Sequence, residues 1–229
     1  MSLDEWRAPR SQGVLWRRMV TTSRQARILP DGCTDLIWSS RTGLMVAGPD
    51  TTAGLSDLTA GESIVGLRFA PGTGPAVFGL PAAELTDQRV PLDALWPAAL
   101  VREIADGMAD TRDGDLLDRL AEARLRAAGG PDPRAQAIAR SLATGATVSA
   151  TAAEVGLTER HLHRASRDLF GYGPKTLARI LRMRRALALL RAGVPKATAA
   201  ADAGYADQPH LSREVRALTG VPLGRLDLS

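Results

Sequence analysis

The stretch GYADQPHLSREVRALTG, residues 204–220, has the plan of a single capped helix with two different faces. Asp207 is a residue type that caps helix N-termini, and Gly220 is a type that ends helices. Three apolar residues lie three or four positions apart and therefore share one face: Leu211, Val215 and Leu218. The opposite face carries proline, serine and arginine, which raises the question of what surface it meets.

The same plan occurs 49 residues earlier, in GLTERHLHRASRDLFG, residues 156–171. Thr158 is the expected cap there, and Gly171 closes the helix. One offset superposes the matched pairs: Leu162 with Leu211, Arg164 with Arg213, Arg167 with Arg216, and Leu169 with Leu218. A short alanine-rich helix and a glycine, Gly156 or Gly204, precede each longer helix. Short helix, turn and longer helix is the helix-turn-helix arrangement.

A helical segment, PKTLARILRMRRALALLRAG at residues 174–193, joins the two copies. No Gly or Pro interrupts it, so we expect one rod of about 18 residues and ~27 Å. Such a rod could hold two recognition helices in successive major grooves, about 34 Å apart on one side of a duplex. We expect Lys175, Arg179 and Arg182 to contact phosphate, with plain solvation as the alternative.

The outer faces of the two longer helices carry side chains that can bind DNA. Arginine can donate two bonds to guanine, and glutamine can pair similarly with adenine. Proline costs nothing in a first helical turn, where its missing amide has no partner, and its ring can contact a thymine methyl. These faces hold Arg160, His163, Arg164 and Arg167 in the first copy, and Gln208, Pro209, Ser212, Arg213 and Arg216 in the second. The alternatives are that Arg164 and Arg213 are ordinary surface arginines and that His163 is a packed or solvated histidine.

The span 133–227 resembles the DNA-binding domain of the AraC/XylS transcriptional regulators. The resemblance rests on the run G-Y-x-D-Q-x-H-x-x-R together with the rod R-x-x-R-A-x-x-L-L. It implies seven helices, double-stranded DNA as the partner, and RNA polymerase as a second partner if the protein is an activator. It also implies the base-contacting residues: Arg160, His163, Arg164, Gln208, Pro209, Ser212 and Arg213. Arg167 and Arg216 would then hold phosphate. Ser166 departs from the family, which usually has a large aromatic residue there, so we expect thin packing in the first unit.

Composition separates the chain into two unlike parts. Residues 1–130 hold 14 Arg and no Lys against 17 acidic residues, whereas residues 131–229 hold 13 Arg and 2 Lys against 8. GGPDPR, residues 129–134, has the glycine and proline content of a linker. We therefore predict an α+β protein with an effector or dimerisation domain at 1–128 and a basic DNA-binding domain at 133–229.

The N-terminal part carries a strand pattern. Between residues 14 and 72, short apolar or alternating runs are separated by Gly, Pro and Asp, which predicts a small β-barrel or sandwich; helices follow from 98 to 128. LPDGCTDLIW, VAGPDT and IVGLRFAPG resemble a poorly characterised domain that often precedes AraC-type domains. Front domains of that family are commonly cupin-like and bind a small effector or pair two subunits. The resemblance therefore leaves two alternatives: a small effector as partner, or a homodimer built by a pure dimerisation module without a ligand.

A candidate effector site lies in the front domain. Asp31, Asp35 and Arg68 could line a pocket with Trp38 as its apolar wall. Alternatively, Asp31 and Gly32 form a turn, Trp38 belongs to the core, and Arg68 pairs with Asp35.

Enzymatic activity is not expected; the alternative is a front-domain enzyme with a DNA-targeting tail, which would need catalytic residues in the front domain. Cys33 is the only cysteine, which excludes an internal disulfide; it is either a redox sensor or a small buried residue. Residues 1–130 contain no histidine for a metal centre, and no base lies near Cys33 in the sequence. We expect no cofactor and no metal. No apolar run approaches the ~20 residues of a membrane span, and no secretory signal begins the chain, so we expect a cytoplasmic protein.

Overall fold

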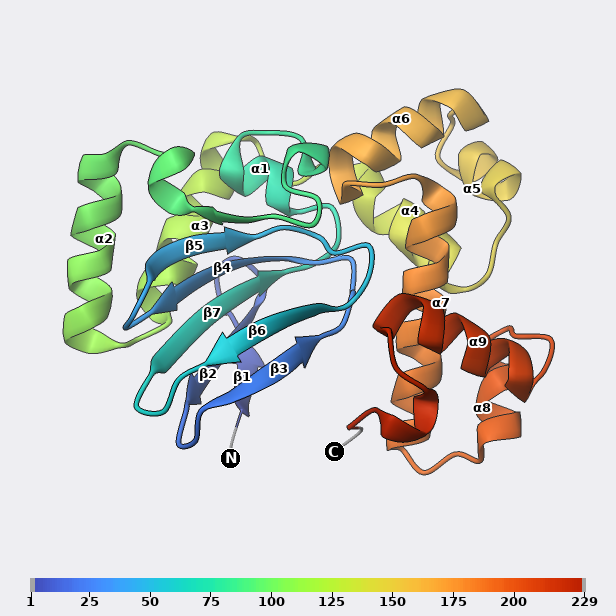
Figure 1. Ribbon diagram of the computed structural model, residues 1–229. Helices are drawn as coiled ribbons and strands as arrows, with labels where there is room; N and C mark the ends of the chain where they lie inside the picture. Colours follow the sequence, from blue (N-terminus) through green and yellow to red (C-terminus); the bar gives the residue numbers. More distant parts are fainter. Residues whose placement is uncertain (1–2, 228–229) are drawn as a thin grey trace.

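The computed structural model describes residues 3–227 and places a β-rich part beside a helical part (Figure 1). The strands are β1 (Leu3–Arg7), β2 (Val14–Met19), β3 (Arg24–Ile28), β4 (Thr34–Ser39), β5 (Gly43–Ala47), β6 (Gly54–Leu58), β7 (Ser63–Phe69) and β8 (Arg89–Pro91). The helices after them are α1 (Gly74–Phe78), η1 (Ala82–Glu84), η2 (Leu92–Ala94), α2 (Ala98–Thr111) and α3 (Asp115–Ala127). The α+β class expected from the sequence is confirmed.

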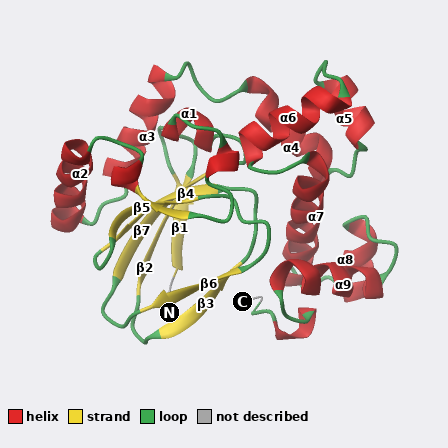
Figure 2. Cartoon of the chain, turned by 45° about the horizontal axis from the view of Figure 1, so that its top comes forward, coloured by secondary structure: helices red, strands yellow, loops and turns green. Residues whose placement is uncertain are grey.

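Six strands form one antiparallel sheet in the order β1-β2-β7-β4-β5-β8, and β3 pairs with β6 in a separate ribbon. Helices α1–α3 cover one face of the sheet, and the ribbon lies on the other side (Figure 2). Over the described residues the sheet ends at β1 and β8 without closing, so of the two expected architectures the sandwich is the one observed.

Two cores fill the β-rich part. The larger lies between the sheet and its helices and contains Leu36, Trp38, Leu67, Phe69 and Met108. The smaller lies between the sheet and the ribbon: Val20, Ala26, Leu58 and Ile64. Because successive side chains of a strand point to opposite faces, one strand can serve both cores.

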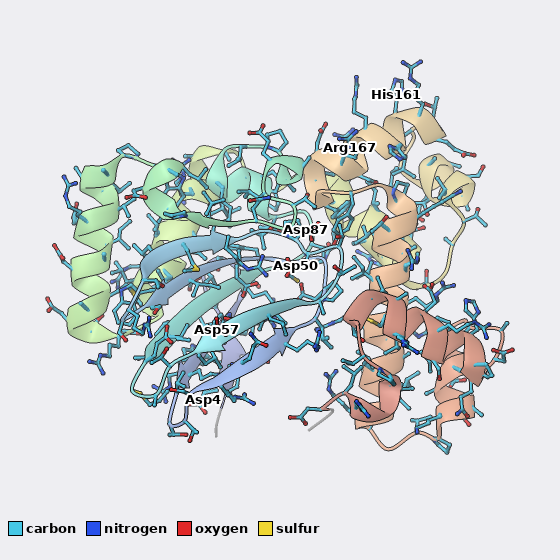
Figure 3. The ribbon with its side chains drawn as sticks, viewed as in Figure 1. Asp4, Asp50, Asp57, Asp87, His161 and Arg167 are labelled. Atoms are coloured by element: carbon cyan, nitrogen blue, oxygen red, sulfur yellow. The ribbon has the colours of Figure 1, made fainter. Side chains whose placement is uncertain are left out.

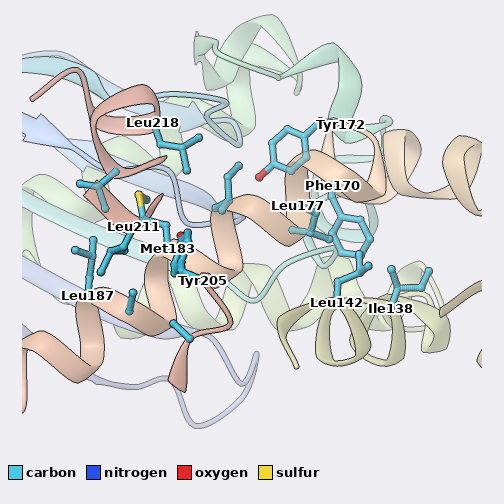
Figure 4. Packing of buried hydrophobic residues seen from close by; sticks show 14 of the residues in the cluster. Ile138, Leu142, Phe170, Tyr172, Leu177, Met183, Leu187, Tyr205, Leu211 and Leu218 are labelled. Atoms are coloured by element: carbon cyan, nitrogen blue, oxygen red, sulfur yellow. The ribbon is translucent and has the colours of Figure 1, made fainter. Parts of the chain in front are cut away.

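The helical part begins at Pro133, within the predicted linker at residues 129–134. Its helices are α4 (Pro133–Ala143), α5 (Val148–Glu154), α6 (Glu159–Phe170), α7 (Pro174–Arg191), α8 (Lys196–Asp202), α9 (Gln208–Thr219) and η3 (Leu223–Arg225). The seven expected helices are thus six α-helices and one 3-10 turn within residues 133–227. Their buried side chains form a single core around α7, including Phe170, Leu177, Met183 and Leu211 (Figure 4).

None of the helices within residues 3–227 has the length and apolar character needed to cross a bilayer. Within the same residues, no three His, Cys, Asp or Glu side chains are grouped as a metal site would require.

Candidate nucleic-acid interface

The two longer helices of the repeat, α6 and α9, are built alike. The Thr158 hydroxyl accepts a bond from the His161 amide at 3.2 Å, and the Asp207 carboxylate accepts one from the His210 amide at 2.6 Å. Each helix has 12 residues and stops at a glycine in the left-handed region, with φ +86° at Gly171 and +74° at Gly220. Only glycine takes that conformation without a Cβ clash, so the 49-residue repeat is a repeat of structure.

The inner faces of α6 and α9 pack on opposite ends of α7. Leu162 and Leu169 join the core on one side, and Leu211, Val215 and Leu218 join it on the other. Alpha-helix geometry gives the 18-residue α7 a length of about 27 Å. Figure 1 shows α7 running between the two helix-turn-helix units. The spacing of the two recognition helices therefore depends on α7.

Each outer face forms a shallow hollow, and the expected DNA-contacting residues divide between the two hollows. The first is lined by Glu159, Arg160, His163, Arg164, Arg167 and Asp168, with Ala83 at one edge. The second is lined by Gln208, Ser212, Arg213 and Arg216, together with Lys196 and residues 222–224. Pro209 is exposed in the first turn of α9. Figure 3 shows Arg167 and His161 on the side of α6 that faces away from the sheet.

The charged residues of α7 have unlike surroundings. Lys175 is exposed. Arg179 donates two bonds to the Glu214 carboxylate at 3.0 and 3.1 Å, and Arg182 lies 3.6 Å from the same carboxylate. The Arg182 guanidinium also stacks over the Tyr205 ring at 4.6 Å. Arg179 and Arg182 therefore face α9, where they join it to α7.

Glu214 was missed by sequence reasoning, although it lies at the centre of this contact. Burial by itself would raise the pKa of its carboxyl group. The bonds from Arg179 and the positive charges of Arg179 and Arg182 outweigh that effect, so the pKa lies below its ordinary value. The sequence did carry one sign of this role. Glu214 directly follows Arg213 and therefore lies on a different side of α9 from the expected DNA-contacting residues.

His161 and His210 occupy the same position in the two copies, 49 residues apart, but their surroundings differ. His210 accepts a bond from the Ala206 amide through Nδ1 at 3.4 Å, and its ring meets Tyr205 edge-on at 5.2 Å. This side chain fixes the turn before α9. His161 is exposed and makes no such bond in the described part of the chain. The turn before α6 is one residue shorter, which leaves no equivalent amide for it.

Two sequence families match the chain. Residues 151–227 match a helix-turn-helix domain family, and this span contains both capped recognition helices and α7. Residues 151–227 are an AraC-type helix-turn-helix domain. Residues 13–91 match a domain of unknown function (DUF6597), which covers β2 to β8. The front region therefore precedes the AraC-type domain in the order expected from the sequence.

Solved structures with a similar layout include two of ToxT from Vibrio cholerae. One, from strain O395 and bound to (E)-4-(8-methylnaphthalen-1-yl)but-3-enoic acid, has 10% identity and a TM-score of 0.48, covering 91% of this chain and 95% of that one. A 1.65 Å structure has 8% identity and a TM-score of 0.47, covering 97% of each chain. No curated protein matched the chain by sequence.

The candidate effector residues do not surround one pocket. Trp38 is buried in the core under the helices, whereas Asp35 points to the ribbon side of the same strand. Positions three apart on a strand face opposite ways, so Trp38 cannot be the wall of a site containing Asp35. This part of the expectation is wrong, and the alternative role of Trp38 as a core residue is the observed one.

The remaining three candidates, Asp31, Asp35 and Arg68, do meet. The Arg68 Nε atom lies 3.4 Å from Asp35 and 3.5 Å from Asp31, and the Trp16 indole donates to Asp35 at 2.8 Å. Burial raises the pKa of Asp35 despite the nearby positive charge of Arg68. Burial also raises the pKa of Cys33, helped by the charges of Asp31 and Asp35, so its thiol stays protonated at neutral pH.

Proposed function

We propose that this protein is a transcription factor that binds double-stranded DNA with α6 and α9 in adjacent major grooves. The observation that carries the proposal is the pair of helices of equal length, each capped by a side chain and ended by a glycine, exposed on their outer faces and packed on the same helix, α7. Arginine, glutamine and histidine on those faces are the side chains that bind base edges and phosphates.

Residue roles follow from exposure and partners. We assign base contact to the N-terminal halves of the two helices: Arg160, His163, Arg164, Gln208, Pro209, Ser212 and Arg213. Arg167, Arg216 and Lys175 are exposed and are assigned to phosphate. Arg179 and Arg182 reach phosphate only by leaving Glu214, and we assign them chiefly to holding α9 on α7.

The division of the chain is part of the same proposal. Residues 133–229 bind DNA, and residues 1–128 adjust that binding by holding a small effector or by pairing two subunits. Asp31, Asp35 and Arg68 are the proposed effector contacts, because they form a half-buried polar cluster on the ribbon side of the sheet. A non-enzymatic, cytoplasmic regulator is the role this division supports, with RNA polymerase as partner where it activates.

Selection from random DNA duplexes by the full-length protein tests the proposal. The expected result is an enriched motif of two half-sites. Arg213→Ala should weaken binding to that motif by about 1–3 kcal/mol and relax the base preference in one half-site. Arg191→Ala, at the exposed end of α7, is the matched control and should bind as wild type does. Equal binding by Arg213→Ala and wild type would contradict the assignment.

Two solution measurements distinguish an effector-binding front domain from a pure dimerisation domain. A thermal-shift screen of the full chain against small polar molecules should give a hit that Arg68→Met abolishes, if the cluster binds an effector. A chain that binds no compound and sediments as a dimer would favour the dimerisation role.

A further inference from the structure

The C-terminal ends of both recognition helices are held by the β-rich part of the chain. At α6, the Thr86 hydroxyl lies 3.0 Å from the Gly171 carbonyl oxygen and is placed to donate to it. At α9, the Ala53 amide donates to the Leu218 carbonyl oxygen at 2.7 Å, and the Arg27 guanidinium donates to the Thr219 carbonyl oxygen at 2.9 Å. The carbonyls at a helix C-terminus lack partners within the helix, so each of these donors meets an acceptor that would otherwise face solvent.

The contacts to the two helices come from one connected structure. The β5–β6 loop, residues 48–53, is bonded to residues 85–89 by backbone and side-chain groups; we call this pair of segments the strut. The Gly48 amide donates to the Gln88 carbonyl oxygen, and the Asp87 amide donates to the Pro49 carbonyl oxygen. The amide and the hydroxyl of Thr51 each donate to the Asp87 carboxylate at 2.7 Å. Arg89 adds a two-bond pair with Asp50.

The strut is therefore joined to both recognition helices at once. Thr86 belongs to one of its segments and contacts the end of α6, and Ala53 belongs to the other and contacts the end of α9. Figure 3 shows Asp50 and Asp87 on the side of the sheet nearest to the C-terminal helices. The fit at α6 is close, since a Cβ placed on Gly171 would lie 2.3 Å from the Thr86 hydroxyl.

We propose that the strut, with Arg27, positions α6 relative to α9 and so sets the spacing between the two DNA half-sites. This inference rests on the proposed function. Helix α7 joins the two units through their inner faces, and the strut joins them a second time through their C-terminal ends. The base-contacting residues lie in the N-terminal halves, so the strut can fix the geometry of the pair without covering those residues.

A spacing series tests this role. Full-length wild type first selects a motif from random duplexes, and one base pair is then added or removed between the half-sites, which moves one half-site by about 3.4 Å along the duplex. We expect wild type to lose about tenfold or more in affinity on either altered duplex. Thr86→Val with Arg27→Met removes two of the three donors, and this variant should lose less than about threefold.

Matched controls distinguish positioning from general damage. Thr111→Val with Arg24→Met removes a similar hydroxyl bond and a cation from the same strand as Arg27, away from the recognition helices. It should keep the wild-type spacing profile. If the Thr86→Val, Arg27→Met double variant fails to fold, Arg27→Met alone replaces it in the test. The spacing profile of that single variant should lie between those of wild type and a protein without the strut contacts.

The outcomes separate this inference from the function beneath it. A two-part motif with the same spacing profile in wild type and variant would overturn the role of the strut and leave the proposed function standing. A motif with one half-site would overturn the role of the strut and also the binding of two adjacent major grooves proposed above. No enriched motif for wild type would overturn both.

Discussion

Replacing Glu214 with glutamine should loosen α9 from α7. The substitution keeps the size of the side chain but removes the charge that faces two arginines. Hydrogen bonds to charged groups contribute about 1.5–3 kcal/mol each. The Arg179 side chain is 42% exposed, so solvent screens part of this pair, and glutamine keeps one acceptor. We expect a net loss of about 1–3 kcal/mol in the free energy of unfolding, or about 2–12 °C in Tm for a chain of this size.

The pH dependence identifies the charge as the cause. Because the folded-state pKa of Glu214 is lowered, its stabilisation is fully present above the ordinary glutamate pKa of about 4.3. It is lost as pH falls through the lower folded value, where the wild-type side chain becomes neutral like glutamine. Thermal and urea unfolding of both proteins from pH 7 downward should therefore show the difference between them shrinking below about pH 4.5.

A control residue and a contrary result complete the test. Glu154→Gln changes an exposed glutamate on α5 and should alter Tm by less than about 1 °C. Two results would refute the ion-pair explanation. One is a stability difference between wild type and Glu214→Gln that stays constant through the acidic range; the other is equal stability of the two proteins at pH 7.

Three further results are expected. Gly171→Ala should cost more stability than Gly220→Ala in urea unfolding, although both force alanine into the left-handed region at about 1–2 kcal/mol. A Cβ at Gly171 would lie 2.3 Å from the Thr86 hydroxyl and clash with it, whereas a Cβ at Gly220 would lie 3.5 Å from the flexible Arg27 side chain, an ordinary contact. Ser166→Ala should leave Tm equal or raise it, because that buried hydroxyl has no partner in the described structure, whereas Ser141→Ala should lower it by breaking a buried bond at 3.1 Å. Lys175→Gln should reduce the slope of log K against log salt for DNA binding by about 1.

The strand pattern was recoverable in part. Four of the apolar runs between residues 14 and 72 are strands, as expected: VLWRRMV is β2, CTDLIWSS is β4, GLMVAG is β5 and SIVGLRFAPG is β7. A fifth run, RILP, overlaps only the last two residues of β3, and β1, β6 and β8 were not predicted. LDEWR and GLSDL lack a regular apolar alternation, and β8 has only three residues. Such strands form because neighbouring strands offer them hydrogen bonds, which is information outside the local sequence.

The prediction of the effector site was partly wrong for a different reason. Asp35 and Trp38 were grouped because they are close in sequence, although the two-residue period of a strand already places them on opposite faces. The ion pair between Arg68 and Asp35 was among the expected alternatives and is observed.

The sequence by itself determined the two recognition helices: their caps at Thr158 and Asp207, their glycine ends, and the rod between them are local features, set by backbone chemistry within a few residues. Tertiary structure alone decided which side of α7 meets Glu214, and which loops reach the ends of α6 and α9. Those contacts join residues 35 to 192 positions apart, and no local pattern encodes such a pairing because it depends on how separately formed elements pack.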